Sequence, residues 1–355
     1  MKILADHLSK ITKNRVISDL GDGEKTVLLH QFDRLIFLCN NFVSATKIKR
    51  GLEGLGRNVI IVSAARENTN ENDPNLLPFA DAISKYLSKA VDTLIFLPCS
   101  MIVRFDLLKF KPIQIKKGGV YNFDNIIQSL SENGYTRSSL ASEPGQFAVR
   151  GDILDVFTTS NERPYRIEFF DDTVESISTF DETTMKNLSQ FDEVALPLSN
   201  LPIGQNTVFD LEGAKIIDEP KKLSEEIDLL FQSYSVMSGF NSSLYAEFDE
   251  LCQRADHIFD NFQTSTPDYY NEKISPRSYL TDFMALKQDI ADFKNLGQAI
   301  ILFAGQERFQ KNLAGFLTEN SIAFTEYKPD TKLEKGNVYI SPLALPYSFS
   351  FFREG

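Results

Sequence analysis

The chain has 355 residues, a hydrophobic content of 42% and a formal net charge of −12. This length exceeds one ordinary core, so we expect two or three domains, and the apolar content excludes disorder as the main state. Affinity for DNA comes largely from lysine and arginine, so an acidic chain disfavours autonomous DNA binding. A protein partner that offers cations fits the charge better.

Neither the N-terminus nor an internal segment predicts a membrane anchor. No apolar run approaches the roughly 20 residues that cross a bilayer, and the opening MKILADHLSK has no apolar signal core. Cys39, Cys99 and Cys252 form no CxxC pair, so a zinc site is not expected. We expect a soluble, cytoplasmic protein without a bound metal.

Residues 1–115 carry the pattern of an α/β layer. Strands that are apolar on both sides and alternate with helices indicate a parallel sheet covered on both faces. We therefore expect 1–115 to form the first part of a parallel α/β domain. Its expected strands are Arg34–Cys39, Asn58–Val62 and Thr93–Leu97, and its expected helices are Ser44–Leu55 and Leu77–Ala90.

From about Lys116 the pattern changes to that of a small α+β antiparallel domain, here called the β-module and bounded at residues 116–203. An amphipathic helix at Phe123–Asn133 opens it. Val174 and Ile177 have opposite parity, which predicts a β-bulge. The expected strands, separated by turn residues, are Gln146–Arg150, Ile153–Phe157, Tyr165–Phe170 and Thr173–Thr179.

After about Gly204 the chain becomes helical and then returns to α/β character. The economical topology is one α/β domain in two pieces, 1–115 and 204–355, with the β-module inserted between them and a helical insertion in the second piece. Separate domains are the alternative. The expected helices are Lys221–Phe231, Ser243–Phe262 and Glu307–Glu319, and the expected strands are Gln298–Phe303 and Asn337–Ser341.

The nearest approach to a catalytic motif is Gly21-Asp22-Gly23-Glu24-Lys25-Thr26. A phosphate loop has the form GxxxxGK[ST], in which backbone N–H groups wrap the phosphates and the lysine meets their charge. Lys25 and Thr26 supply the last two positions, but Asp19 and Glu24 replace the glycines and put carboxylates where phosphates would lie. None of the strands that we expect ends in an Asp-Glu pair for Mg²⁺. We therefore assign no catalytic, cofactor or metal residue.

The segment Tyr165–Phe170 predicts a face that docks a protein partner. Side chains alternate with a period of two, so Arg166, Glu168 and Phe170 share the face opposite to the core. Aromatic and arginine side chains dominate binding hot spots, and a neighbouring glutamate adds charge complementarity. Arg150 joins this face if the strands pair in sequence.

A purely structural alternative exists for the same residues. The helix Phe123–Asn133 could cover Phe170, and Arg166 and Glu168 could be a surface pair of little energetic value.

The run EPGQFAVRGDILD at Glu143–Asp155, followed by PYRIEFFDD at Pro164–Asp172, closely resembles the domain-2 signature shared by UvrB helicases and the transcription-repair coupling factor Mfd. The resemblance implies that the split α/β domain is a degenerate P-loop-helicase-like domain without ATPase activity. It also implies that the β-module recruits UvrA. The residues that it assigns to UvrA are Arg150, Arg166 and Phe170, with Glu168 beside them.

The resemblance further implies a longer protein. In this family, an ATP-dependent DNA translocase motor with its ATP and Mg²⁺, and the contacts to RNA polymerase and duplex DNA, lie in later domains, beyond residue 355. We expect this chain to be the N-terminal part of a factor in transcription-coupled nucleotide excision repair. The alternatives are a divergent UvrB-type ATPase that binds nucleotide near Lys25, and a DNA-binding clamp.

Overall fold

A computed structural model of the chain describes residues 11–64, 66, 73–236, 240–262, 266–270, 282–328 and 331–343. The fold is α/β and consists of two compact units. The first unit comprises Met1–Val59, Gly213–Leu223 and Ala255–Gly355, and the second comprises Ile60–Glu212 and Ser224–Arg254.

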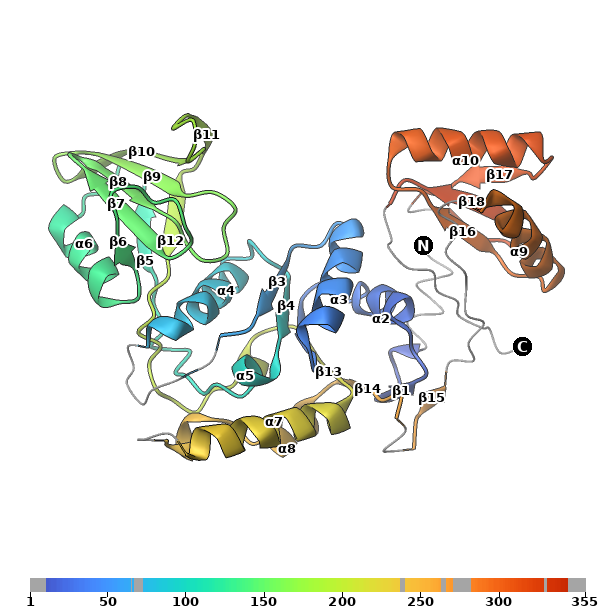
Figure 1. Cartoon of the computed structure of the whole chain (residues 1–355), viewed down its shortest axis with the longest axis horizontal. Helices are drawn as coiled ribbons and strands as arrows, with labels where there is room; N and C mark the ends of the chain where they lie inside the picture. The colour runs from blue at the N-terminus through green and yellow to red at the C-terminus, as the bar shows by residue number, and fades with distance from the viewer. Residues whose placement is uncertain are drawn as a thin grey trace. The chain divides into compact units, whose positions relative to one another are not determined.

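The first unit holds parallel strands that come from distant parts of the sequence. They are β1 (Val16–Ser18), β2 (Leu35–Leu38), β13 (Ala214–Asp218), β14 (His257–Phe259) and β15 (Tyr269–Tyr270). In the sheet they follow the order β15-β1-β14-β13-β2, and each neighbouring pair is parallel. Figure 1 shows β15, β1, β14 and β13 side by side. Residues after 213 therefore complete a sheet that begins before residue 60. Helices α2 (Asp22–Leu29) and α3 (Phe42–Gly54) follow β1 and β2 in the chain.

Two of these strands, β13 and β14, lie where the sequence analysis predicts no strand. We expected helix from about Gly204 onward and over Ser243–Phe262, but β13 and β14 lie there, and the helix α8 is limited to Phe248–Arg254. Their sequences, AKIID and HIF, hold apolar runs of only two residues, too short to distinguish a strand from a helix. The helix predicted at Lys221–Phe231 is confirmed within α7 (Pro220–Ser235).

The second unit contains the other predicted α/β elements and the β-module. Strands β3 (Val59–Val62) and β4 (Thr93–Phe96) are neighbours, and α4 (Leu77–Leu87) lies between them in the chain. A short helix, α5 (Pro98–Met101), follows β4. These elements match the strands and helix expected for this segment.

The β-module is built on a sheet with the order β11-β10-β9-β8-β7-β6 and a separate pair, β12 with β5. All pairs are antiparallel except β6 with β7. The register of β10 shifts between Val174 and Ser176, which confirms the predicted bulge. The elements are β5 (Ile113–Lys116), α6 (Phe123–Glu132), β6 (Thr136–Arg137), β7 (Gln146–Arg150), β8 (Ile153–Val156), β9 (Tyr165–Phe170), β10 (Thr173–Phe180), β11 (Asn187–Gln190) and β12 (Glu193–Leu196).

Helix α6 lies against one face of this sheet (Figure 1). Its buried residues Ile126 and Leu130 share a hydrophobic core with Ile167 and Phe169 of β9. Apolar side chains on one helical stripe and at every second strand position therefore make the core of the module.

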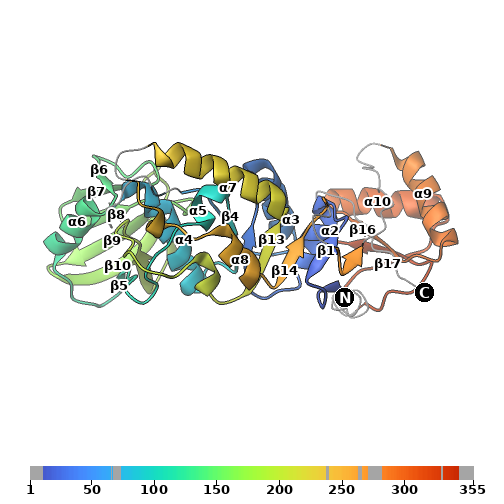
Figure 2. The ribbon, with the colours of Figure 1, turned by 90° about the horizontal axis from the view of Figure 1, so that it is seen from below.

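The C-terminal part of the first unit has a sheet of its own. Strands β16 (Ile300–Phe303) and β17 (Phe324–Glu326) flank β18 (Val338–Ser341), all in parallel. Helices α9 (Phe283–Asn295) and α10 (Glu307–Glu319) pack on this sheet through one hydrophobic core (Figure 2). The strands predicted at Gln298–Phe303 and Asn337–Ser341 thus pair with each other rather than with β1 or β2.

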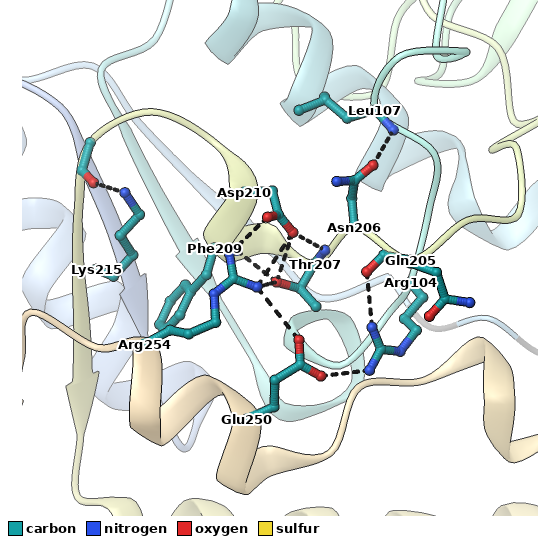
Figure 3. Close-up of polar contacts among 11 residues, drawn as sticks. Arg104, Leu107, Gln205, Asn206, Thr207, Phe209, Asp210, Lys215, Glu250 and Arg254 are labelled. Carbon is teal, nitrogen blue, oxygen red and sulfur yellow. Dashed lines mark hydrogen bonds and ion pairs between the residues drawn. The ribbon is translucent and has the colours of Figure 1, made fainter.

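A polar network holds the segment after the β-module to α8 (Figure 3). Arg254 Nη2 lies 2.8 Å from Asp210 Oδ1, and Arg104 Nη2 lies 2.5 Å from Glu250 Oε2. Burial alone would raise the pKa of the Asp210 carboxyl, but hydrogen bonds from Arg254 and Thr207 hold it below its ordinary value. The network stabilises the return of the chain from the β-module to β13.

Candidate protein-binding site

The face of the β-module opposite to α6, called here the outer face, carries Arg150, Arg166, Glu168 and Phe170. Ile167 and Phe169 of β9 are buried in the core, so Arg166, Glu168 and Phe170 have the opposite parity, as the alternation predicts. The Phe123 ring of α6 lies 4.9 Å from the Phe169 ring, on the core side. Phe170 is 66% exposed, so the alternative in which the helix covers this side chain is wrong.

Arg150 joins the outer face because β7, β8 and β9 pair in sequence order. It lies opposite Ile153, which in turn lies opposite Glu168. The Arg150 side chain is 42% exposed, and its Nη2 lies 2.5 Å from Oδ2 of Asp155. Asp155 thus fixes the guanidinium of Arg150 through one nitrogen, while part of the side chain remains exposed to a partner.

Arg166 lies on the outer face but is only 7% exposed. Its Nε is 2.8 Å from Asp155 Oδ1, its Nη2 is 3.0 Å from Asp155 Oδ2, and its guanidinium stacks 4.1 Å from the ring centroid of Phe180. The hydrogen bonds to Asp155 raise the pKa of Arg166 above its ordinary value. The expected accessible arginine is therefore largely enclosed by its own module.

Asp155 is the site residue that sequence reasoning missed. Its carboxylate is fully buried and accepts hydrogen bonds from both arginines. A charged residue at the outer-face parity of an otherwise apolar strand was the available signal, since buried carboxylates require paired cations. Glu168 is half-buried and accepts a hydrogen bond from the Ser176 hydroxyl at 2.6 Å.

The phosphate-loop-like segment lies at the start of α2. A helix N-terminus ordinarily attracts anions through its unpaired N–H groups. Here the Glu24 side chain reaches back to accept a hydrogen bond from the Gly21 N–H at 3.0 Å. Asp19, at the position of the first loop glycine, keeps a left-handed backbone with φ of 60°. The backbone at Asp19 therefore keeps a conformation that glycine favours, but the Glu24 carboxylate lies at the start of the helix, where a phosphate loop would bind phosphate.

Lys25 is buried in an ion cluster inside the first unit. Its Nζ lies 2.6 Å from Asp218 Oδ1 and 3.3 Å from Glu219 Oε1. Burial lowers the pKa of the Lys25 ammonium, but the charges and hydrogen bonds of the two carboxylates raise it to about 12. Burial also raises the pKa of Glu219.

The pair Asp218-Glu219 corrects the sequence analysis. We expected no strand to end in Asp-Glu, but β13 ends at Asp218, directly before Glu219. The pair was missed because β13 itself was missed. The described residues contain no group of three or more His, Cys, Asp or Glu arranged to hold a metal ion. Nor does the described chain contain a helix long and apolar enough to cross a membrane.

A family model matches the part of the chain that holds the β-module. The model of the UvrB interaction domain matches residues 113–200. The β-module is thus similar to the UvrB interaction domain. Its strands β5 to β12 and helix α6 all fall inside the matched range.

The chain is similar to curated proteins named transcription-repair-coupling factor and to others named UvrABC system protein B. The chain is 39% identical over 83 residues to the transcription-repair-coupling factor of Myxococcus xanthus, which is 23% of this chain and 7% of that protein. It is 26% identical over 202 residues to the transcription-repair-coupling factor of Haemophilus influenzae, covering 53% of this chain and 18% of that protein. It is also 42% identical over 73 residues to the UvrABC system protein B of Vibrio vulnificus, covering 20% and 11%. The chain therefore spans a small part of the relatives that it matches.

Proposed function

We propose that this chain is part of a transcription-repair coupling factor and that its UvrB interaction domain recruits UvrA through the outer face. The observation that carries the proposal is Phe170, an aromatic side chain that is 66% exposed on a domain whose other face is filled by its own helix. Large aromatic residues beside an arginine are typical of interface hot spots.

The proposed role extends to the rest of a longer protein. An ATP-dependent DNA translocase motor and the contacts to RNA polymerase and duplex DNA would lie in domains outside these 355 residues. The β-module would then bring UvrA to a lesion where RNA polymerase has stalled, in the cytoplasm, as a step of nucleotide excision repair. The chain itself would contribute binding and no catalysis.

The test is the affinity of the purified chain for UvrA. Phe170→Ala and Arg150→Ala are each expected to weaken binding by about 2 kcal/mol. The matched controls are Phe42→Ala and Arg50→Ala on α3, because Phe42 is 61% exposed and Arg50 is exposed outside the β-module. Unchanged affinity in both outer-face variants would remove the proposed site.

A second candidate function is nucleotide binding near Lys25. The contact of Lys25 with an Asp-Glu pair at a strand end favours it, because nucleotide sites combine a loop lysine with such acids. We propose that the site is closed, since the residues present do not fit a triphosphate. The Glu24 carboxylate accepts the hydrogen bond of the Gly21 N–H at the start of α2. The carboxylates of Asp218 and Glu219 already neutralise the Lys25 charge. Saturable binding of a fluorescent ATP analogue by the chain would contradict this view.

DNA binding by this chain is the third candidate, and the net charge of −12 disfavours it. A DNA clamp predicts an affinity for duplex DNA that falls steeply with salt concentration. We expect no measurable affinity of the isolated chain for duplex DNA at physiological salt.

A further inference from the structure

Only part of the outer face is exposed to a partner. The register of its strands groups the side chains into rows, and the exposure differs from row to row. Arg166 lies opposite Asp155 on one side and Ser178 on the other. Asp155 and Ser178 are fully buried, and Arg166 nearly so. This row of side chains therefore belongs largely to the interior of the module and offers a partner little surface.

Accessibility begins with the next row, two residues further along β9. In this row Glu168 lies opposite Ser176 of β10 and Ile153 of β8, and Ile153 lies opposite Arg150. Arg150 is exposed and the other three side chains are half-buried.

The last row of β9 continues onto a segment outside the sheet. Phe170 lies opposite Thr173 at the turn between β9 and β10, and Thr173 forms an antiparallel bridge with Val120. The Tyr121 N–H donates to the Asp172 carbonyl at 2.8 Å, and the Val174 N–H donates to the Gly119 carbonyl at 2.9 Å. These bonds flank Val120 and Thr173, as in a non-hydrogen-bonded antiparallel pair, whose side chains share one face.

Val120 and Phe170 are consequently two apolar side chains in one row, with Thr173 between them. Val120 is 72% exposed and Phe170 is 66% exposed. Folding does not account for this arrangement, because neither side chain contributes to the core of the module. Exposed apolar groups within a charged rim mark interaction sites on soluble proteins.

The charges around the two side chains describe the complementary surface. Asp171, Asp172 and Glu175 are exposed on the turn side, and Arg150 is exposed one row away. A partner that fits would place an apolar pocket against Val120 and Phe170. It would place cations near the turn and a carboxylate near Arg150.

We propose that Val120 contacts UvrA and enters the same apolar pocket as Phe170, whereas Arg166 makes no direct contact. This inference rests on the proposed function. It adds Val120 to the proposed site, a residue outside the strands whose alternation predicted the outer face. Val120 lies about 50 positions before Phe170 in the chain, and only the bridge to Thr173 brings the two together.

The test measures UvrA affinity for the 355-residue chain carrying Val120→Ser, Phe170→Ala or both. Val120→Ser is expected to weaken binding three- to tenfold with an unchanged melting temperature, because the side chain is exposed and its backbone bonds remain. Residues that share a pocket are coupled, so the double variant should lose less than the product of the two single losses. Val43→Ser is the matched control, because Val43 is 65% exposed on α3.

Each outcome separates the inference from the function on which it rests. If Phe170→Ala weakens binding and Val120→Ser does not, the inference is wrong and the proposed function stands. If both single losses occur but multiply fully, the shared pocket is overturned. If neither variant changes UvrA affinity, the inference is overturned, and unchanged affinity in Arg150→Ala as well would overturn the proposed function. If Val120→Ser changes only the self-association of the chain in sedimentation, the face serves a second copy and the assignment to UvrA is overturned.

Discussion

Arg166 and Asp155 form a two-pronged ion pair inside the β-module, with Nε 2.8 Å from Oδ1 and Nη2 3.0 Å from Oδ2. The same carboxylate also receives Nη2 of Arg150 at 2.5 Å. One buried acid therefore fixes two arginines that have different roles. Arg166 completes the interior of the module, whereas Arg150 remains accessible on the outer face.

Asp155→Asn should destabilise the β-module by about 3–5 kcal/mol, because it leaves the Arg166 charge buried without its counter-ion. Chemical unfolding followed by circular dichroism measures the effect, since the chain lacks tryptophan. Asp152→Asn is the matched control, because Asp152 is exposed at the turn after Arg150. Equal unfolding midpoints for Asp155→Asn and wild type would show that the pair contributes nothing to stability.

Arg166→Lys should lower stability more than it lowers affinity. Lysine cannot reproduce the two-pronged contact with Asp155 or the planar stacking on Phe180. We expect a loss of about 1–3 kcal/mol in unfolding free energy, in line with charge-assisted hydrogen bonds. UvrA affinity measured well below the melting temperature should stay within about threefold of wild type. A loss as large as that of Arg150→Ala, with unchanged stability, would instead make Arg166 a direct contact.

Phe169 and Phe170 are adjacent residues with opposite expected effects. Phe169→Ala should cost about 3–5 kcal/mol of stability, because its ring is buried against Phe123. Phe170→Ala should change stability by less than about 0.5 kcal/mol, because its ring is mostly exposed. Calorimetric melting of the two variants checks the contrast. Similar destabilisation by both would place Phe170 in the core.

Lys25→Met should destabilise the first unit by about 3 kcal/mol or more at pH 8, because Asp218 and Glu219 lose their counter-ion. The pKa of Lys25 is raised from 10.5 to about 12, so its stabilising charge is complete below pH 10.5 and is lost as the pH rises toward 12. In the variant, Glu219 loses the lysine charge that lowers its pKa, so the pKa of Glu219 should rise further, and a protonated carboxyl needs no counter-ion.

The melting deficit of Lys25→Met should therefore shrink from pH 8 to pH 5. Lys47→Met is the control, because Lys47 makes a surface pair with Asp22 at 3.1 Å and its side chain is 47% exposed. A deficit that is independent of pH would mean that the protonation of Glu219 does not depend on the lysine charge.

The sequence by itself determined the local features of the outer face. The alternation in YRIEFF set the parity of Arg166, Glu168 and Phe170, and the opposite parity of Val174 and Ile177 indicated the bulge that the structure contains. Both features depend only on the period of a strand, which neighbouring residues define. The helix α6 and the predominantly apolar strands β2, β3 and β4 were also predictable, because their own residues define the pattern.

Only the tertiary structure decided which of these side chains are accessible. Arg166 is enclosed because register brings Asp155 beside it and the ring of Phe180 closes over it. Val120 joins Phe170 through a bridge between segments that no periodicity connects. Lys25 meets Asp218 across 193 positions of sequence, at the end of a strand whose apolar run is only two residues long. Exposure and charge pairing depend on contacts between distant segments, and a pattern along one segment does not contain them.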